Sequence, residues 1–235
     1  MLQKTRGIVL RSIKYGDSSL VCTIFTEVYG VQTYMVQGVR SMKVRSNRAG
    51  LLQPATLLDM VVYHKPQKSM QRISEFLPAY IYQSLQEEII KNSIALFSVE
   101  LLLRVLPENA PMPELYEFTS DYFQQLDKME VSAIANFPLF FIMQCANILG
   151  YDIKENEGAL MQGIPLIPGA ITLSEGDIHV LNALLQVTDV KDLKKISMNA
   201  VLRFRLLDWY IEFLQQHTQH MGQIKSLAVL QAILH

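Results

Sequence analysis

The chain has 235 residues, half of them hydrophobic, and a formal net charge of −1 at neutral pH. This length allows one large or two modest domains, and the apolar content argues against an intrinsically disordered protein. No apolar run reaches the roughly 18 residues that a membrane helix needs, and the first residues lack a signal-peptide pattern, so we expect a cytoplasmic protein without membrane association. Cys22 and Cys145 lie far apart in apolar segments, which favours buried free thiols over a disulfide.

Short strand patterns follow one another in the first part of the chain. They are rich in β-branched residues or alternate apolar with polar residues, and turn residues separate them. The expected strands are residues 5–13, 19–26, 31–37, 55–63 and 70–76. Five short strands fit a small closed barrel better than an open sheet with exposed edges. We therefore expect a five-stranded oligonucleotide-binding (OB) β-barrel, although an SH3-like barrel would give nearly the same pattern.

A basic segment lies between the third and fourth expected strands. Residues 38–54 contain no acid and four cations, which are Arg40, Lys43, Arg45 and Arg48. Glycine, serine and asparagine in this segment favour a loop. Cations two or three residues apart suit a run of phosphates, because each head group can reach its own anionic oxygen. A solvated surface loop would have the same composition, so both interpretations stay open.

Charge is distributed unevenly along the chain. Residues 1–78 contain 11 Lys and Arg and four acids, a formal charge of +7, whereas the remainder contains 10 cations and 18 acids, a charge of −8. A basic first part indicates a polyanionic partner, most commonly a nucleic acid. Ten basic side chains of this part are our candidates for nucleic-acid binding: Arg6, Arg11, Lys14, Arg40, Lys43, Arg45, Arg48, Lys65, Lys68 and Arg72.

From residue 80 onward, apolar residues recur at intervals of three and four, which is typical of amphipathic helices. The expected helices are residues 80–105, 111–126, 131–149, 174–187, 197–217 and 226–234. The third is almost entirely apolar, which indicates the central helix of a bundle. We therefore expect an α+β protein with an OB-fold DNA-binding domain at 1–79 and an all-α helical domain at 80–235.

Several short motifs stand out in the first 80 residues: Arg6-Gly7-Ile8-Val9-Leu10-Arg11, Tyr15-Gly16-Asp17-Ser18, Tyr29-Gly30, Gly38-Val39-Arg40 and Leu52-Gln53-Pro54. In this order and spacing they resemble the RecO family of DNA repair proteins. The helical part agrees with the family in layout only. The resemblance implies an N-terminal OB barrel, a C-terminal helical domain and no catalytic site.

The resemblance also implies activities and partners. Proteins of this family bind single- and double-stranded DNA, anneal complementary strands, and help load recombinase onto strands coated by single-strand-binding protein. They work with RecR, and they recognise the C-terminal tail of single-strand-binding protein through an apolar pocket with basic residues. Cations are scarce in the acidic helical part, so we expect this pocket near Arg104, Arg203 or Arg205, unless these arginines pair with the domain's own acids.

One departure from the family concerns metal binding. Many RecO-like proteins carry a four-cysteine zinc element between the third helix and the next one. Residues 150–176 contain no cysteine here, so we expect no structural zinc and no other cofactor. His217 and His220 lie three residues apart, but no acidic partner recurs nearby at ligand spacing, which favours exposed polar residues over a metal site.

Other candidate features leave alternatives open. Tyr15, Tyr29, Tyr34 and Tyr63 are candidates for stacking on bases, or they form the barrel wall. Besides a DNA-binding mediator, we consider an RNA-binding OB module and an enzyme with an unrecognised site at 152–168. The chain lacks the glycine-rich phosphate-binding motif Gly-x-x-x-x-Gly-Lys, so nucleotide hydrolysis has no support in the sequence.

Overall fold

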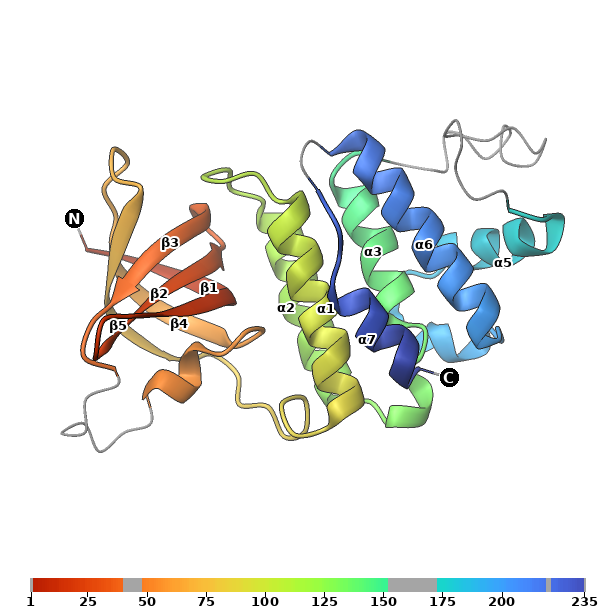
Figure 1. Cartoon of the computed structure of the whole chain (residues 1–235), viewed down its shortest axis with the longest axis horizontal. Coiled ribbons are helices and arrows are strands. Elements are labelled where there is room, and N and C mark those ends of the chain that lie inside the picture. The colour runs from red at the N-terminus through yellow and green to blue at the C-terminus, as the bar shows by residue number, and fades with distance from the viewer. Residues whose placement is uncertain (1, 40–47, 152–172, 219–220, 235) are drawn as a thin grey trace. The chain divides into compact units, whose positions relative to one another are not determined.

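The computed structural model describes residues 2–39, 48–151, 173–218 and 221–234 (Figure 1). The chain divides into two compact units, and each is described by itself. The first unit comprises Met1–Gln83 and Leu106–Gln124, and the second comprises Ser84–Val105 and Gln125–His235.

The first unit is built on a closed β-barrel. Its strands are β1 (Leu2–Tyr15), β2 (Ser19–Thr26), β3 (Gly30–Val36), β4 (Leu57–Tyr63) and β5 (Met70–Pro78). Around the barrel they follow the order β1-β2-β3-β5-β4, and every neighbouring pair is antiparallel except β3 and β5. This connectivity confirms the predicted five-stranded OB-type barrel.

Strand β1 closes the barrel because it pairs along both of its edges. Residues 2–8 pair with β4, and residues 7–15 pair with β2, with a register shift between Val9 and Arg11. Near the shift, the backbone N–H of Ala55 donates to the carbonyl oxygen of Val9 at 2.8 Å. A strand that bends at such an irregularity can serve two neighbours, which removes the exposed sheet edges.

The strand boundaries follow the sequence prediction within three residues, and the difference at β4 is instructive. Strand β2 spans the predicted residues 19–26, whereas β4 begins at Leu57 and not at the predicted residue 55. Ala55 has a φ of 68°, in the left-handed region that strand residues do not adopt. The contact between Ala55 and β1 therefore holds the chain in a turn before β4 starts.

Residues 106–124, which follow the first helix in the chain, belong to the same unit as the barrel. The ring of Tyr116 meets that of Phe25 edge-on, with 5.6 Å between ring centroids. Gly30 has a φ of 66°, and a Cβ atom built there would lie 2.1 Å from the carbonyl oxygen of Ala110, so only glycine fits this approach. The side chain of Gln32 donates to Asn109 Oδ1 at 2.8 Å.

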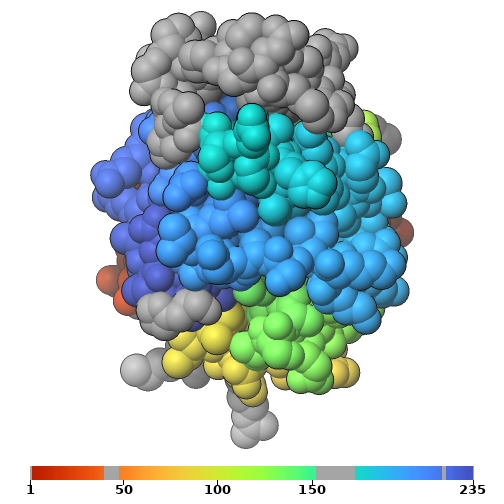
Figure 2. All heavy atoms as spheres, turned by 90° about the vertical axis from the view of Figure 1, so that its right-hand side faces the viewer, coloured from red at the N-terminus to blue at the C-terminus, as the bar shows by residue number. Residues whose placement is uncertain are grey.

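The second unit is all-α, as predicted. Its helices are α1 (Ile89–Val105), α3 (Phe137–Ile148), α5 (Glu175–Leu185), α6 (Ala200–His217) and α7 (Ser226–Ile233), and the helix α2 (Pro113–Lys128) ends in it. Short 3-10 turns occupy Val131–Ala133 and Val190–Lys195. Helix α3 packs against both α1 and α6, and its apolar residues are almost all buried, which confirms it as the central helix. In Figure 2, the segments from α5 to α6 cover most of the face turned to the viewer.

Two predicted helices begin more than three residues later than expected. Helix α1 begins at Ile89 and not near residue 80, and the expected helix 131–149 divides into a 3-10 turn and α3. Pro138 lies in the first turn of α3, where the missing N–H costs no hydrogen bond. The predicted start near residue 174 is confirmed, because Ser174 and Asp177 form a reciprocal capping box at the start of α5. Cys22 and Cys145 are buried free thiols, also as predicted.

A buried carboxylate fixes the chain just before α1. One oxygen of Asp127 accepts hydrogen bonds from the backbone N–H groups of Ser84 and Leu85, both at 2.8 Å. The ammonium group of Lys91, itself buried, donates to Ser84 Oγ and to the carbonyl oxygen of Asp127. Because the backbone N–H groups of this turn donate to a side chain and not to the carbonyl groups of a helix, the helix starts later than the apolar pattern predicts.

Replacing Asp127 by alanine should therefore destabilise the second unit. The buried N–H group of Leu85 and the partly buried N–H group of Ser84 would lose their acceptor, which costs about 2–4 kcal/mol in the free energy of unfolding. The single tryptophan, Trp209, is buried in α6 of this unit, so its fluorescence during urea unfolding reports the change. Asp121→Ala, at an exposed position of α2, is the matched control and should leave the unfolding midpoint unchanged. Equal midpoints for the two variants would contradict this role of Asp127.

Candidate nucleic-acid interface

The structure describes seven of the ten candidate cations of the basic part. Arg40, Lys43 and Arg45 lie outside the described residues. The seven others belong to strands and turns of the barrel: Arg6, Arg11, Lys14, Arg48, Lys65, Lys68 and Arg72.

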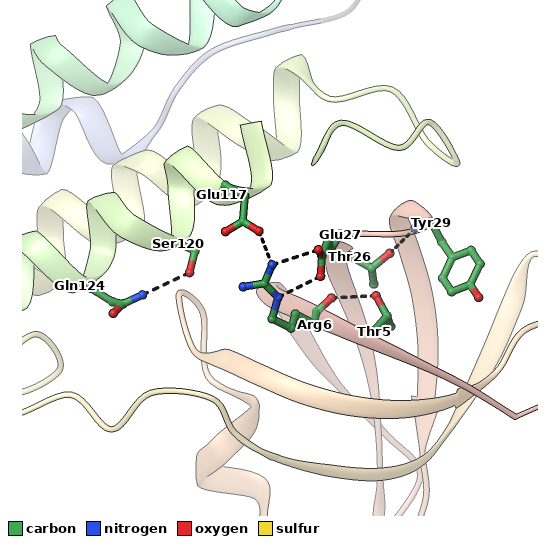
Figure 3. A network of polar contacts seen from close by, with 8 residues as sticks. All are labelled: Thr5, Arg6, Thr26, Glu27, Tyr29, Glu117, Ser120 and Gln124. Carbon is green, nitrogen blue, oxygen red and sulfur yellow. Dashed lines mark hydrogen bonds and ion pairs between the residues drawn. The ribbon is translucent and has the colours of Figure 1, made fainter. Parts of the chain in front are cut away.

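Arg6 differs from the other six because carboxylates surround its guanidinium (Figure 3). Its Nε and Nη2 atoms donate to the two carboxylate oxygens of Glu27 at 2.9 and 3.0 Å, and Nη2 also contacts Glu117 of α2. The guanidinium carbon lies 5.4 Å from the ring centroid of Tyr116. The hydrogen bond from Arg6 lowers the pKa of the Glu27 carboxyl. Arg6 thus links β1 to the β2–β3 turn and to α2.

The turn that carries Glu27 is itself held in place. Thr26 Oγ1 accepts from the backbone N–H of Tyr29 at 3.1 Å (Figure 3). It also donates to the carbonyl oxygen of Gly30 at 2.8 Å. Because Thr26 is fully buried, this turn has little freedom to move. Glu27 is therefore presented to Arg6 by a fixed backbone, and not by a mobile loop.

The six other cations form no ion pair with any described carboxylate. We call them the unpaired barrel cations: Arg11, Lys14, Arg48, Lys65, Lys68 and Arg72. All are exposed except Arg48, which is half-buried with its guanidinium carbon 4.7 Å from the ring centroid of Phe76. A cation without a carboxylate partner is free to bind a phosphate oxygen.

The acids of the barrel gather around Arg6. Of the four acids in residues 1–78, Glu27, Asp59 and Glu75 line one cavity of about 450 Å³, together with Lys4 and Arg6. A second cavity of about 220 Å³ is lined by Arg48 and Arg72, and no acid contributes to it. Positive charge is therefore balanced on one part of the barrel surface and unbalanced on another.

A buried glutamine shapes the turn between β4 and β5. Gln71 accepts a hydrogen bond from the backbone N–H of Lys65 and donates to the carbonyl oxygens of Lys65 and Lys68, at 2.7–2.8 Å. This fixes the backbone of both lysines while their side chains remain exposed. The sequence prediction missed Gln71, since a polar residue in a strand gives no signal of its inward orientation.

The four candidate tyrosines fall into two groups. Tyr34 is completely buried, which raises the pKa of its hydroxyl, and Tyr29 stacks on His64 with 3.9 Å between ring centroids. Tyr15 and Tyr63 are 56% and 44% exposed. Only the latter two present a ring to solvent in a way that suits base stacking.

The three candidate arginines of the helical unit also differ. Arg203 is buried and donates to Asn136 Oδ1 at 2.9 Å, and burial lowers its pKa. Arg205 donates to the carboxylate of Asp177 at 2.8 Å. Arg104 is 38% exposed, with Glu100 at 3.9 Å. The Arg205 side chain is 42% exposed, but its guanidinium is held at 2.8 Å by Asp177, so Arg104 has the looser ion pair of the two exposed arginines.

No cluster of three or more His, Cys, Asp or Glu side chains suitable for a metal ion occurs in the part of the chain that the structure describes. His217 Nδ1 lies 2.8 Å from the carbonyl oxygen of Phe213, and His220 is outside that part. The segment 152–168, considered above for an enzyme site, is also outside it. None of the described helices is long and apolar enough to cross a membrane.

The architecture defines a class of protein in which an OB barrel precedes a helical region. Residues 1–82 match the family model for the Recombination protein O N terminal, and residues 86–228 match that for the Recombination protein O C terminal. The chain belongs to the RecO family of DNA repair proteins.

Curated relatives named DNA repair protein RecO align over almost their whole length. Those from Christiangramia forsetii and Bacteroides fragilis (strain ATCC 25285) are each 28% identical to this chain, over 240 and 242 residues. The relative from Phocaeicola vulgatus is 29% identical over 243 residues. Each alignment covers 99% of both chains, so the resemblance seen in the first 80 residues extends through the helical unit.

The Arg6–Glu27 pair should contribute to stability in a pH-dependent way. Because the pKa of Glu27 is lowered in the folded protein, its contribution is complete above the unfolded pKa and is lost as the pH falls through the folded value. Glu27→Gln should lower the free energy of unfolding by about 1 kcal/mol at pH 7. As the pH falls through the folded pKa of Glu27, the difference from the unmodified protein should disappear. Calorimetric melting from pH 3 to pH 7 measures this.

Glu75→Gln is the control for that measurement, because Glu75 is exposed on β5 and lies next to the same cavity. It should give the same melting temperature as the unmodified protein throughout the range. A Glu27→Gln difference that persists unchanged to pH 3 would show that the ion pair is not its cause.

Proposed function

We propose that this RecO-family protein is a non-enzymatic mediator of DNA repair and recombination that acts in the cytoplasm. It binds single- and double-stranded DNA through its barrel and anneals complementary strands. It also helps load recombinase onto strands coated by single-strand-binding protein. Its proposed protein partners are RecR and the C-terminal tail of single-strand-binding protein.

The DNA-binding part of this proposal rests on one observation: three of the barrel's four acids lie near Arg6, and its other described candidate cations have no carboxylate partner. Three acids gather at the cavity that contains Arg6, whereas the unpaired barrel cations have no described carboxylate partner. Exposed unpaired cations repel one another, and a polyanion removes that repulsion while releasing its own counterions. We therefore assign the phosphate contacts to the unpaired barrel cations and leave Arg6 out of them.

The positions of four of these cations suit an OB barrel that binds a strand. Lys14 lies near the end of β1, before the turn to β2, with Arg11 three residues earlier on that strand; Lys65 and Lys68 belong to the turn between β4 and β5. The β1–β2 and β4–β5 loops are those with which OB folds bind oligonucleotides. Arg40, Lys43 and Arg45 remain sequence-based candidates for additional phosphate contacts.

Removing four unpaired barrel cations should weaken DNA binding through its salt-dependent component. In the variant with Arg11, Lys14, Lys65 and Lys68 replaced by alanine, the logarithmic dependence of affinity on salt should become shallower by up to about three units, roughly 0.7–0.9 for each lost contact. Fluorescence anisotropy with single-stranded and duplex oligonucleotides at several salt concentrations measures this slope. An RNA competitor in the same titration distinguishes a DNA-binding protein from an RNA-binding module.

The control for this experiment changes charge elsewhere. Lys191 and Lys194 are exposed residues of the 3-10 turn in the helical unit, and their replacement by alanine should leave the slope unchanged. An equal slope in the quadruple variant and the unmodified protein would refute the proposed phosphate contacts.

For the tail of single-strand-binding protein, Arg104 is the best placed of the predicted arginines. Its neighbour Glu100 is committed to the start of α7, since its carboxylate accepts from the backbone N–H groups of Lys225 and Ser226 and from Ser226 Oγ. The exposed guanidinium of Arg104 can therefore bind a second carboxylate. A peptide with a free C-terminal carboxylate and an acidic sequence supplies such a group.

Arg104→Gln should weaken binding of the tail peptide about three- to tenfold, as expected for the loss of one charge-assisted hydrogen bond. Its affinity for naked DNA should not change, because the proposed phosphate contacts belong to the barrel. Isothermal titration with the peptide measures the effect, and Lys191→Gln is the charge-matched control. Equal affinities for the two variants would place the tail site elsewhere.

A further inference from the structure

The second cavity of the barrel, lined by Arg48 and Arg72, has properties that phosphate binding alone does not require. In the barrel register, Arg72 of β5 lies directly between Met35 of β3 and Tyr63 of β4. Residues directly opposite one another on paired strands point to the same side of the sheet. A thioether, a guanidinium and a phenol ring therefore form one row along the outside of the barrel.

The two arginines of this cavity are available to an anionic ligand. Arg72 donates one hydrogen bond, from Nη2 to Gln37 Oε1 at 3.0 Å, and its remaining donors have no described acceptor. Arg48 lies over the ring of Phe76, which orients its guanidinium plane without neutralising its charge. A phosphate that reaches the cavity would meet two positive groups and no negative one.

The apolar part of the cavity suits a flat ring. Tyr63 is 44% exposed and has no aromatic ring partner among the described residues, and Met35, on the other side of Arg72, is half-buried. Stacking between a base and an aromatic side chain tolerates any sequence because every base has a π-face. The sulfur of a methionine adds a polarisable contact at the edge of such a ring.

Polar groups stand at the edge of the same cavity. The side-chain amide of Gln37 has its nitrogen 3.7 Å from Met35 Sδ, which is a weak acceptor. Ser74 also lines the cavity, and its side chain is exposed. An amide and a hydroxyl group can exchange hydrogen bonds with the edge of a base that is not paired with another base.

We propose that this cavity binds one unpaired nucleotide of a DNA strand, with its base against Tyr63 and Met35 and its phosphate on Arg72 and Arg48. The proposal rests on the DNA-binding function above and adds a preference to it. A base in a duplex must leave its stack to enter a cavity, whereas an unpaired base enters without that cost. The cavity therefore gives the barrel a higher affinity for single strands than for duplexes.

Tyr63→Leu tests the proposal in the full-length protein. It removes the ring from an exposed position while keeping an apolar side chain, so the barrel should retain its fold. Affinity for a thymidine oligonucleotide should fall about tenfold, and affinity for a duplex of equal length should not change. The salt slope on the single strand should stay the same, because no phosphate contact is lost. Tyr63→Phe keeps the ring and should restore the affinity.

Leu77→Ala is the control, since Leu77 is an exposed apolar residue of the same barrel that lines the cavity around Arg6 and not this one; it should leave the single-strand affinity unchanged. A single-strand affinity for Tyr63→Leu equal to that of the unmodified protein would overturn the proposal, as would an equal loss on duplex DNA. In both cases the DNA-binding function would still stand. If the unmodified protein binds neither form of DNA, both proposals fail. If thymidine monophosphate binds as tightly as the oligonucleotide, the cavity is a mononucleotide site and the strand-binding proposal is wrong.

Discussion

The double pairing of β1 is the constraint on which the barrel surface depends. Because β1 bonds β4 along its first half and β2 along its second, the sheet closes and each outward residue takes a fixed place around it. Arg6 precedes the register shift between Val9 and Arg11, next to the turn that carries Glu27. Arg11 follows the shift and has no described carboxylate partner. One strand thus supplies both a neutralised and a free arginine.

Closure also brings β3 and β5 together, and this creates the proposed nucleotide cavity. The parallel contact between these strands sets Met35 beside Arg72, and the antiparallel contact with β4 adds Tyr63. Tyr63 and Arg72 are nine positions apart across the β4–β5 turn, whereas Met35 precedes Tyr63 by 28 positions. The same closure packs Tyr34 and Val62 inside the barrel, which leaves neighbouring strand positions to face outward.

The sequence predicted the barrel and the all-α unit because alternation and helical periodicity are local signals. Strand β2, bounded by turn residues on both sides, was located correctly. The beginnings of β4 and α1 were not, because a contact of Ala55 with β1 and one of Asp127 with Ser84 and Leu85 decide them, and such contacts join distant parts of the chain.

The sequence predicted which part of the chain is basic, but it did not predict which of its cations are paired with acids. The excess of cations in residues 1–78 is visible in the sequence, but Arg6 and Arg72 look alike there. Their difference arises from Glu27 and Glu117, which lie 21 and 111 positions from Arg6. Likewise, Tyr34 and Tyr63 both lie in predicted strands, but only the folded barrel shows that the first ring is buried and the second exposed. An NMR titration of the full chain with a short thymidine oligonucleotide tests the central claim, that DNA lies on the part of the barrel where cations are unpaired. We predict the largest amide shift changes around Lys68 and Arg72; the largest changes around Arg6 and Asp59 would contradict it.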